Sequence, residues 1–286
     1  MTEGRDAMEV RRLDGGPSEV SPEVRGRLVT ADGAREVAWQ VPAETPVAVL
    51  VNGESFAVMM ATPADLEDFA VGFALTEGIV PSAARIDSLR IGEANDGYLL
   101  NLRVAERFAS AAQDRKRSIA GRSGCGICGA QTIEAAVPRP PRVEGRVPPT
   151  KALMRAYDAL RDVQVMNRTN HSTHAAAFCD LDGKIERVRE DIGRHNALDK
   201  LIGSLARDGR DARDGFILVS SRISVELIQK AAVIGAPFLA AVSAPSKLAL
   251  DVAGRCGMGL ASLAGDGVMV FEPTRGKGGS RQEKVA

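Results

Sequence analysis

In the first half of the chain, apolar and polar residues alternate over short stretches, as they do in half-buried β-strands. Asn52-Gly53 predicts a tight two-residue turn that joins two of these stretches into a hairpin. The predicted strands are EVAWQV (36–41), VAVLV (47–51), ESFAVMM (54–60) and YLLNLRV (98–104). We therefore expect a strand-rich, antiparallel N-terminal lobe at 26–137, preceded by a flexible segment at 1–25.

A helix is predicted between the third and fourth of these strands. Thr62-Pro63-Ala64-Asp65 has the features of a helix start, with proline at the first helical position and acidic residues in the first turn. Apolar residues then recur at helical spacing from Leu66 to Ala74, and Gly78 is expected to end the helix.

The pattern of apolar and polar residues changes in the second half of the chain, where apolar runs of strand length alternate with amphipathic stretches of helix length. A proline-rich connector at 138–149 precedes it, and Thr150 is expected to cap the first helix. The predicted strands are 174–181, 184–190, 216–221, 237–244 and 268–272, and the predicted helices begin near Thr150, Arg194, Ser224 and Ser246. This alternation predicts a C-terminal α/β lobe at 150–273, with parallel strands covered by helices, and a flexible tail at 274–286.

Composition and charge argue against several classes of function. The chain has 286 residues, 37 Lys plus Arg and 37 Asp plus Glu, so no overall charge draws it to nucleic acid or to an anionic membrane. The N-terminus contains acids and lacks the apolar stretch of a signal peptide. The longest uncharged run, 231–246, contains two prolines and is too short to span a bilayer. We therefore expect a cytoplasmic protein, in which thiols stay reduced.

Two of the four cysteines form a Cys-x-x-Cys pair, Cys125 and Cys128, in the glycine-rich segment GRSGCGICGAQT (121–132). The pair could bind zinc with His171 and His174, but His-x-x-His is shorter than the usual zinc-finger spacing. It could also exchange a disulfide or carry a reactive sulfur on an exposed loop, where a nearby helix start would stabilise the thiolate. The sequence predicts no metal site, and Cys179 and Cys256 are expected to be core residues.

A second cluster of polar residues gathers where strands end and helices begin. In such sheets, ligands bind beyond the carboxyl ends of the strands, and helix N-termini attract anions. A cytidine-deaminase type of reaction is not favoured, because none of the three histidines is followed two positions later by glutamate. The cluster predicts a site for a phosphorylated ligand and comprises His174, Arg194, His195, Asn196, Asp199, Lys200, Ser220, Ser221 and Arg222.

Five segments together resemble the formate dehydrogenase accessory sulfurtransferase family, FdhD/NarQ, over roughly residues 40–272. They are TPADLEDFAVGFALTEGIV, GRSGCGICG, THAAAF, EDIGRHNALDK and SSRISVELIQKAAVIGAPFLAAVSAPSKLA. The resemblance implies an α/β fold with a cytidine-deaminase-like mixed sheet and flanking helices. It also implies a cytoplasmic homodimer.

The resemblance further implies a sulfurtransferase. A cysteine desulfurase would hand a persulfide sulfur to Cys125, with Cys128 as its partner. The sulfur would then pass to the molybdenum (or tungsten) bis-pyranopterin guanine dinucleotide cofactor of the formate dehydrogenase catalytic subunit. The cofactor, or a guanine nucleotide such as GDP, would bind at the second cluster. A cofactor-binding chaperone without sulfur chemistry is the alternative, and a zinc-stabilised module is a third.

The sequence departs from the family pattern in one segment tied to cofactor binding. Members usually have two arginines after the last long helix, and this chain has Gly265 and Val268 at those positions. The segment is still expected to bind the cofactor through backbone N–H groups, and it comprises Leu263, Ala264, Gly265, Asp266, Gly267 and Val268.

Overall fold

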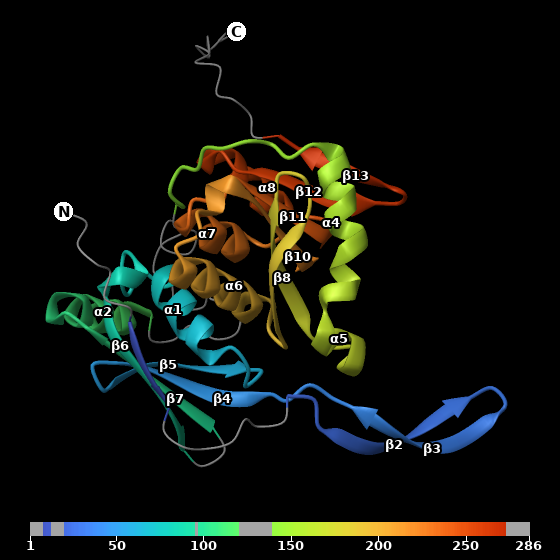
Figure 1. Cartoon of the computed structure of the whole chain (residues 1–286), viewed down its shortest axis with the longest axis horizontal. Helices are drawn as coiled ribbons and strands as arrows, with labels where there is room; N and C mark the ends of the chain where they lie inside the picture. Colours follow the sequence, from blue (N-terminus) through green and yellow to red (C-terminus); the bar gives the residue numbers. More distant parts are fainter. Residues whose placement is uncertain (1–7, 13–19, 95–96, 120–138, 273–286) are drawn as a thin grey trace, which may run out of the picture.

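The structure, a computed structural model, describes residues 8–12, 20–94, 97–119 and 139–272 (Figure 1). Its strands are β1 Glu9–Arg12, β2 Glu23–Thr30, β3 Gly33–Gln40, β4 Thr45–Val51, β5 Glu54–Ala61, β6 Ile86–Ala94, β7 Gly97–Val104, β8 His174–Asp180, β9 Ile185–Asp191, β10 Gly215–Arg222, β11 Phe238–Ser243, β12 Gly259–Ala264 and β13 Gly267–Phe271. Its α-helices are α1 Leu66–Thr76, α2 Glu106–Ile119, α4 Thr150–Val163, α5 Val165–Asn170, α6 Arg194–Asp208, α7 Val225–Val233 and α8 Lys247–Cys256. Two short 3₁₀ helices lie at Ala83–Arg85 and Ala212–Asp214.

The N-terminal lobe contains a five-stranded sheet in the order β1-β6-β7-β4-β5. The predicted hairpin at Asn52-Gly53 is confirmed, since β4 and β5 pair antiparallel and both turn residues have positive φ. The prediction of a wholly antiparallel lobe is wrong, because β4 pairs with β7, and β1 with β6, in parallel. The chain leaves β5 through α1 and re-enters the sheet at β6, which brings β7 beside β4 in the same direction.

The C-terminal lobe contains a six-stranded mixed sheet in the order β13-β12-β11-β10-β8-β9. Strands β10, β11 and β12 run parallel and are connected through α7 and α8. The alternating pattern predicts β10 and β11, but the strand predicted at 268–272 is β13, which pairs antiparallel with β12. The predicted hairpin of β8 and β9 is also confirmed. Strand β12 was not predicted; its six residues form a short apolar run flanked by glycines, which has too little periodicity to be recognised.

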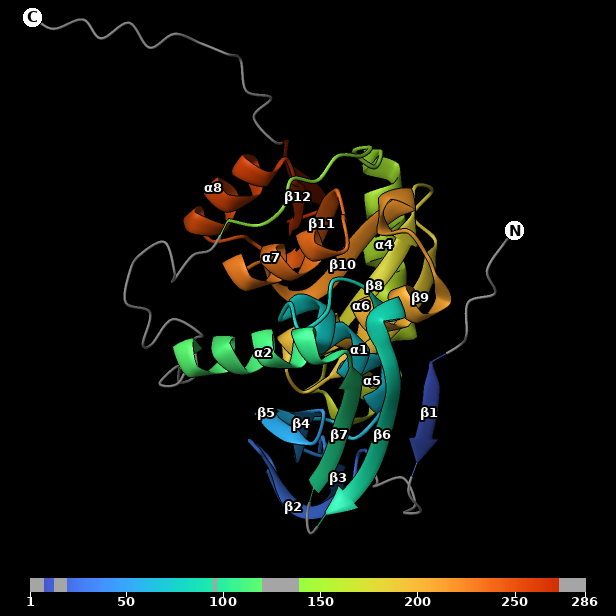
Figure 2. The same cartoon turned by 90° about the vertical axis from the view of Figure 1, so that its left-hand side faces the viewer.

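Helices cover both faces of this sheet (Figures 1 and 2). On one face α4 packs Leu153, Tyr157 and Leu160 against the sheet, and Cys179 lies in this buried cluster. On the other face lie α6, α7 and α8, and Cys256 is buried among them. The prediction that Cys179 and Cys256 are core residues is confirmed, and both are free thiols.

The two lobes share one core. The hydrophobic cluster runs without a break from the five-stranded sheet through α1 and α6 to the six-stranded sheet. Helices α1 and α6 cross so closely that a methyl group at Gly72 would lie 1.7 Å from the carbonyl oxygen of Asp199. The connector at 139–149 has no helix or strand, as predicted, but it does not separate two independent cores.

Two local predictions differ from the structure, and one helix was not predicted. Helix α1 begins at Leu66 rather than Pro63, because Asp65 is in the left-handed region with φ 52°. Thr150 is the first residue of α4 rather than its cap, which is Pro149. Helix α2, Glu106–Ile119, was not predicted, because its apolar residues form too short a stripe to indicate a helix.

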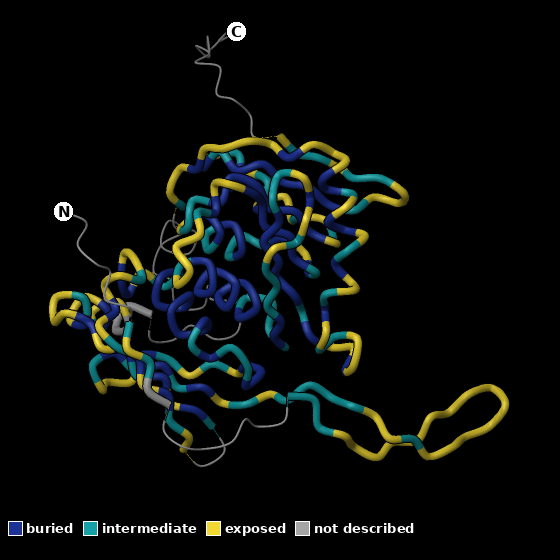
Figure 3. The backbone as a smooth tube through the Cα atoms, in the orientation of Figure 1, coloured by how far each residue is buried: buried dark blue, intermediate teal, exposed yellow. Residues whose placement is uncertain are grey.

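Strands β2 and β3 form a two-stranded arm that projects from the body (Figures 1 and 3). All eight residues of β2 are exposed, and most of those in β3 are as well. None of the helices in the described part of the chain has the length and apolar character needed to span a lipid bilayer.

Candidate functional site

The predicted ligand residues gather at one edge of the six-stranded sheet. Strands β9, β10, β11 and β12 point in the same direction, so their carboxyl ends share this edge. His174 starts the antiparallel strand β8 and therefore lies at the same edge, opposite Asp191. Helices α6, α7 and α8 all begin there. This edge is the place where the topology of an α/β sheet locates a ligand.

His174 and Ser220 meet between β8 and β10. Ser220 accepts a hydrogen bond from the backbone N–H of Ala175 at 2.9 Å, and its Oγ lies 3.4 Å from His174 Nδ1. Burial and then the guanidinium of Arg194 lower the pKa of His174. His174 is therefore a neutral hydrogen-bonding group near pH 7.

Arg194 and His195 form the first turn of α6, which has no side-chain cap. His195 Nε2 is buried and has no hydrogen-bond partner among the described residues. Burial, followed by the charges of Arg194 and Lys230, lowers the pKa of His195 to about 4. His195 therefore adds no positive charge to the site near pH 7. It is a neutral imidazole with one unsatisfied nitrogen.

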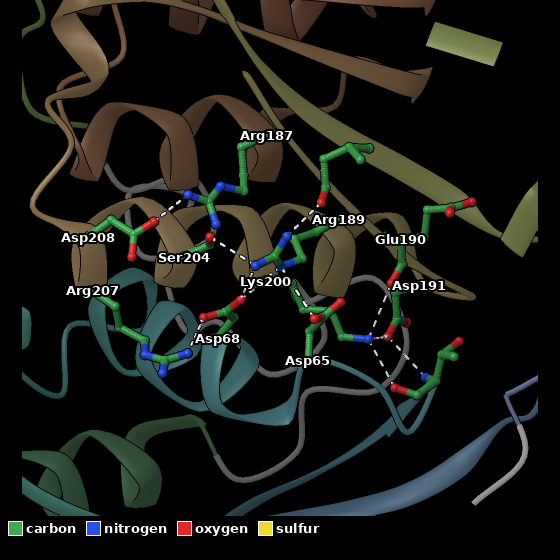
Figure 4. A network of polar contacts seen from close by, with 12 residues as sticks. Asp65, Asp68, Arg187, Arg189, Glu190, Asp191, Lys200, Ser204, Arg207 and Asp208 are labelled. Atoms are coloured by element: carbon green, nitrogen blue, oxygen red, sulfur yellow. Dashed lines mark hydrogen bonds and ion pairs between the residues drawn. The ribbon is translucent and has the colours of Figure 1, made fainter. Parts of the chain in front are cut away.

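Lys200 (Figure 4) and Asn196 are both buried. The ammonium group of Lys200 lies 2.7 Å from Asp191 Oδ2 and donates to the carbonyl oxygens of Thr62 and Glu190. Asn196 donates to Met60 O and to Asp191 Oδ1. All three ammonium protons of Lys200 have partners, so the geometry does not support direct phosphate contact by Lys200 and assigns it to holding the start of α6.

The other strand ends provide hydroxyl groups and one exposed cation. Arg222 is exposed at the end of β10, and the buried hydroxyl of Ser221 donates to the carbonyl oxygen of Arg222. Ser224 is the N-cap of α7, yet its buried Oγ has no partner among the described residues. Ser246 caps α8 by accepting from Ala249 N.

The glycine-containing segment at 263–268 is a β-hairpin. Leu263 pairs with Val268 and Ala264 with Gly267, with the turn at Gly265 and Asp266. Gly265 has φ +61° and has nothing within 4 Å of its missing Cβ. The turn lies at the carboxyl end of β12, at the same sheet edge as the other predicted ligand residues.

A buried hydrogen-bond network, which the sequence analysis did not predict, connects Lys230, Asp199 and Thr76. Lys230 of α7 donates to both carboxylate oxygens of Asp199 at 2.9 Å and to the hydroxyl of Thr76 at 2.9 Å. Burial lowers the pKa of Lys230, but the negative charges of Asp199 and Glu77 have the larger combined effect, so the pKa of Lys230 is raised. The network joins α1, α6 and α7, and no sequence pattern relates residues so far apart.

The cysteine pair, Cys125 and Cys128, lies outside the described residues. His171, considered above as a zinc ligand, is exposed and packs its ring against Trp39 at 5.6 Å between centroids. Within the described part of the chain, no three His, Cys, Asp or Glu side chains are grouped closely enough to hold a metal ion.

Comparison with known proteins shows to which family this chain belongs. The FdhD/NarQ family matches residues 42–273 of the chain. A protein from Bordetella petrii is 46% identical over 231 residues, covering 80% of this chain and 82% of its own, and one from Xanthomonas euvesicatoria is 47% identical over 227 residues, covering 79% and 81%. Both are named sulfur carrier protein FdhD. The chain belongs to the FdhD/NarQ family.

A solved structure shares the FdhD/NarQ fold described here. It is a protein from Desulfotalea psychrophila assigned as a formate dehydrogenase accessory protein. The two structures superpose with a TM-score of 0.68 at 22% identity, over 89% of this chain and 97% of the other. The mixed α/β architecture is therefore common to both proteins, and the finer likeness to cytidine deaminases stays a prediction.

Proposed function

We propose that this FdhD/NarQ protein is a sulfur carrier that takes sulfur from a cysteine desulfurase and delivers it to the cofactor of a formate dehydrogenase. The observation that carries this proposal is the extended similarity to proteins named sulfur carriers, at 46–47% identity over about four fifths of the chain. Cys125 and Cys128 supply the sulfur chemistry that such a role needs.

The first step of the proposed reaction is a thiolate exchange. The thiolate of Cys125 attacks the outer sulfur of the desulfurase persulfide, and the S–S bond of that persulfide breaks. The desulfurase cysteine leaves as a thiolate, and Cys125 now carries the transferred sulfur as a persulfide. One S–S bond forms for each one that breaks, so this step needs no oxidant or reductant.

The proposed acceptor of the sulfur is the molybdenum or tungsten bis-pyranopterin guanine dinucleotide, which is a substrate here. Two features of the sheet edge fit such a molecule. The guanidinium groups of Arg194 and Arg222 suit its phosphates. The unsatisfied His195 Nε2 and Ser224 Oγ suit the hydrogen-bonding edge of a heterocyclic base. With Gly265 and Val268 in the hairpin, phosphate binding depends more on Arg194 and Arg222.

Mass spectrometry of the intact protein tests the sulfur step. After incubation with a cysteine desulfurase and cysteine, the protein should gain whole sulfur atoms that a thiol reductant removes. Cys125→Ala should abolish this gain, whereas the control Cys256→Ala, in a buried core thiol, should retain it. Full formate dehydrogenase maturation by a Cys125→Ala, Cys128→Ala double variant would instead favour a cofactor chaperone without sulfur chemistry.

GDP serves as the probe for the nucleotide end of the site. Arg194→Ala and Arg222→Ala should each weaken GDP binding by about tenfold, the usual effect of losing one charge-assisted hydrogen bond. The control Arg213→Ala removes an exposed cation beside the amino end of β10, at the opposite edge of the sheet, and should leave GDP affinity unchanged. Calorimetric titration provides the affinities, and equal losses in all three variants would contradict the assignment.

A further inference from the structure

The C-terminal end of helix α1 is a point at which helices from distant parts of the chain meet. The last carbonyl groups give a helix end a partial negative charge, and basic side chains near that end are stabilising. Helix α1 has no basic residue in its own last turn. Two cations from other helices lie there instead, Lys230 of α7 and Arg115 of α2.

Lys230 joins this helix end to the candidate site. Its ammonium group donates to Thr76 and Glu77 of α1, at 2.9 and 3.2 Å, and to the carboxylate of Asp199. Asp199 lies four residues after His195 on α6, so the two side chains share one face of that helix, one turn apart. The end of α1 is therefore connected, through one turn of α6, to the sheet edge where the candidate site lies.

Arg115 holds helix α2 to the same end of α1. Its guanidinium nitrogen Nη1 donates to the carbonyl oxygens of Glu77 and Gly78, at 2.6 and 2.7 Å. Gly78 makes this approach possible, because it has φ +65° and a methyl group at its missing Cβ would lie 2.6 Å from Arg115 Nη1. Helix α2 accordingly lies beside α1 (Figures 1 and 2).

Helix α2 leads into the segment that contains the cysteine pair. Its buried residues Ala109 and Ala112 belong to the first half of the helix, and Arg115 is about one turn further along. The last residue of α2 is Ile119, and Cys125 follows it by six positions. Because six residues span at most about 22 Å, the position of α2 limits the places that the Cys125 thiol reaches.

We propose that Arg115 is a positioning residue for sulfur delivery, because it fastens the helix that precedes Cys125 to the helix end that also supports the candidate site. This inference rests on the proposed function, in which Cys125 receives a sulfur and passes it to a ligand bound at that site. The sulfur donor is a separate protein that approaches the cysteine from solvent, whereas the acceptor is bound on this chain. Arg115 therefore matters for delivery and not for loading.

Arg115→Ala separates delivery from loading. Sulfur loading, measured by intact mass after incubation with the desulfurase and cysteine, should match the wild type, and so should GDP affinity. The formate dehydrogenase activity matured by the variant should fall by about tenfold or more, because a small misplacement of reacting groups costs a large factor in rate. Maturation equal to that of the wild type would overturn the proposal, as would parallel losses in all three measurements.

Two further variants of α2 complete the comparison. Arg115→Lys should recover maturation, because both hydrogen bonds come from one guanidinium nitrogen and a single ammonium group has enough protons to replace them. The matched control is Arg107→Ala, in the first turn of α2, where the guanidinium lies 4.8 Å from the ring centre of Phe108. The control should leave loading, GDP affinity and maturation unchanged. A loss of maturation in Arg107→Ala as large as in Arg115→Ala would contradict the role of the two hydrogen bonds.

A distance measurement tests the position of the cysteine independently of sulfur chemistry. In a background with Cys128→Ser and Arg213→Cys, spin labels attach to Cys125 and to position 213. Cys179 and Cys256 are buried thiols and should stay unlabelled. The side chain of Arg213 is 67% exposed beside the amino end of β10, so a label there reports from the sheet edge opposite the candidate site.

Pulsed electron paramagnetic resonance gives the distribution of distances between the two labels. Adding Arg115→Ala to this background should broaden or shift the distribution, and adding Arg107→Ala should not. An unchanged distribution in Arg115→Ala would overturn the positioning role. A wild-type protein that loads no sulfur would overturn the proposed function instead, and the distance result would still decide whether Arg115 positions the cysteine.

Discussion

At the scale of single residues, Asp191 organises the junction of the two lobes. Its carboxylate accepts from the backbone N–H groups of Thr62 and Gly193 and from the side chain of Asn196. It also forms an ion pair with Lys200 (Figure 4). The charges of Asp191 and Lys200 are fully buried, so each needs the other to offset the cost of leaving water. The pair thereby fixes the start of α6, where Arg194 and His195 enter the candidate site.

His195 should make the stability of the protein depend on pH. The pKa of His195 in the folded state, about 4, is below its ordinary value of 6.5, so the unfolded chain binds a proton at pH values where the folded chain does not. Stability is therefore present above about pH 6.5 and is lost as the pH falls toward 4. Burial is the main cause of the lowered pKa; the charges of Arg194 and Lys230 add to it, and Glu226 and Glu77 oppose it.

Urea unfolding of wild type and His195→Gln at pH 7 and pH 5 measures this effect. Between the two pH values, the wild type should lose about 1–2 kcal/mol more than the variant, which cannot titrate there. The lowered pKa of His174 affects the pH dependence of both proteins equally, so it cancels when the two losses of stability are compared. An equal pH dependence in the two proteins would show that His195 is protonated alike in the folded and unfolded states.

At the scale of elements, two glycines determine how α1 and α6 pack. A methyl group at Gly203 would lie 1.8 Å from the carbonyl oxygen of Asp68, and Gly72 faces α6 in the same way. The crossing lets Asp68 receive hydrogen bonds from Arg189 at 2.6 Å and from Arg207 at 2.5 Å, which tie α1 to β9 and to the end of α6 (Figure 4). The same helix crossing therefore combines close backbone contact with charge pairing.

Gly203→Ala should destabilise the protein by about 2–4 kcal/mol, because backbone atoms of α1 would have to move away from α6. Gly254→Ala in α8 is the matched control, since nothing lies within 4 Å of its missing Cβ. The control should be neutral or more stable by up to about 1 kcal/mol, because alanine favours a helix over glycine. Urea denaturation measures both values, and equal effects would contradict the role of close packing.

At the scale of the whole molecule, the body behaves as a single folding unit with one projecting arm. The apolar face of α6 is covered by α1, and the hydrophobic cluster crosses the connector that separates the lobes in the sequence. The candidate site lies at the edge of the C-terminal sheet, but its support from Thr62, Thr76 and Glu77 comes from the N-terminal lobe. The integrity of the site therefore requires both lobes.

Cutting the chain in the connector should unfold both halves. Expressed separately, residues 1–145 and 146–286 would each expose the face that α1 and α6 bury against one another. Neither fragment should show a cooperative thermal transition by far-ultraviolet circular dichroism. A sharp transition in residues 146–286 alone would demonstrate an independent C-terminal domain.

Local patterns predicted the elements whose determinants lie within a few residues. The β4–β5 turn needs only residues that tolerate positive φ, which Asn52 and Gly53 supply. Ser246 caps α8 because its hydroxyl reaches a backbone N–H three residues away. The start of α1 was mispredicted because Thr62, a good local cap, instead accepts from the backbone N–H of Ile192 across the lobe junction.

The sequence by itself determined the α/β class, the hairpins, the positions of most C-terminal helices and the family, because periodicity, turn chemistry and ordered motifs are properties of neighbouring residues. The tertiary structure alone decided which of the candidate residues carry an exposed charge and which are enclosed or neutral. Lys200 and His195 look like cations in the sequence, yet one is enclosed by Asp191 and two carbonyl oxygens and the other is held neutral by burial. Thr62, which helps enclose Lys200, lies 138 positions away, and Asp191 and Glu190 come from the neighbouring strand β9, so only the folded chain brings these groups together.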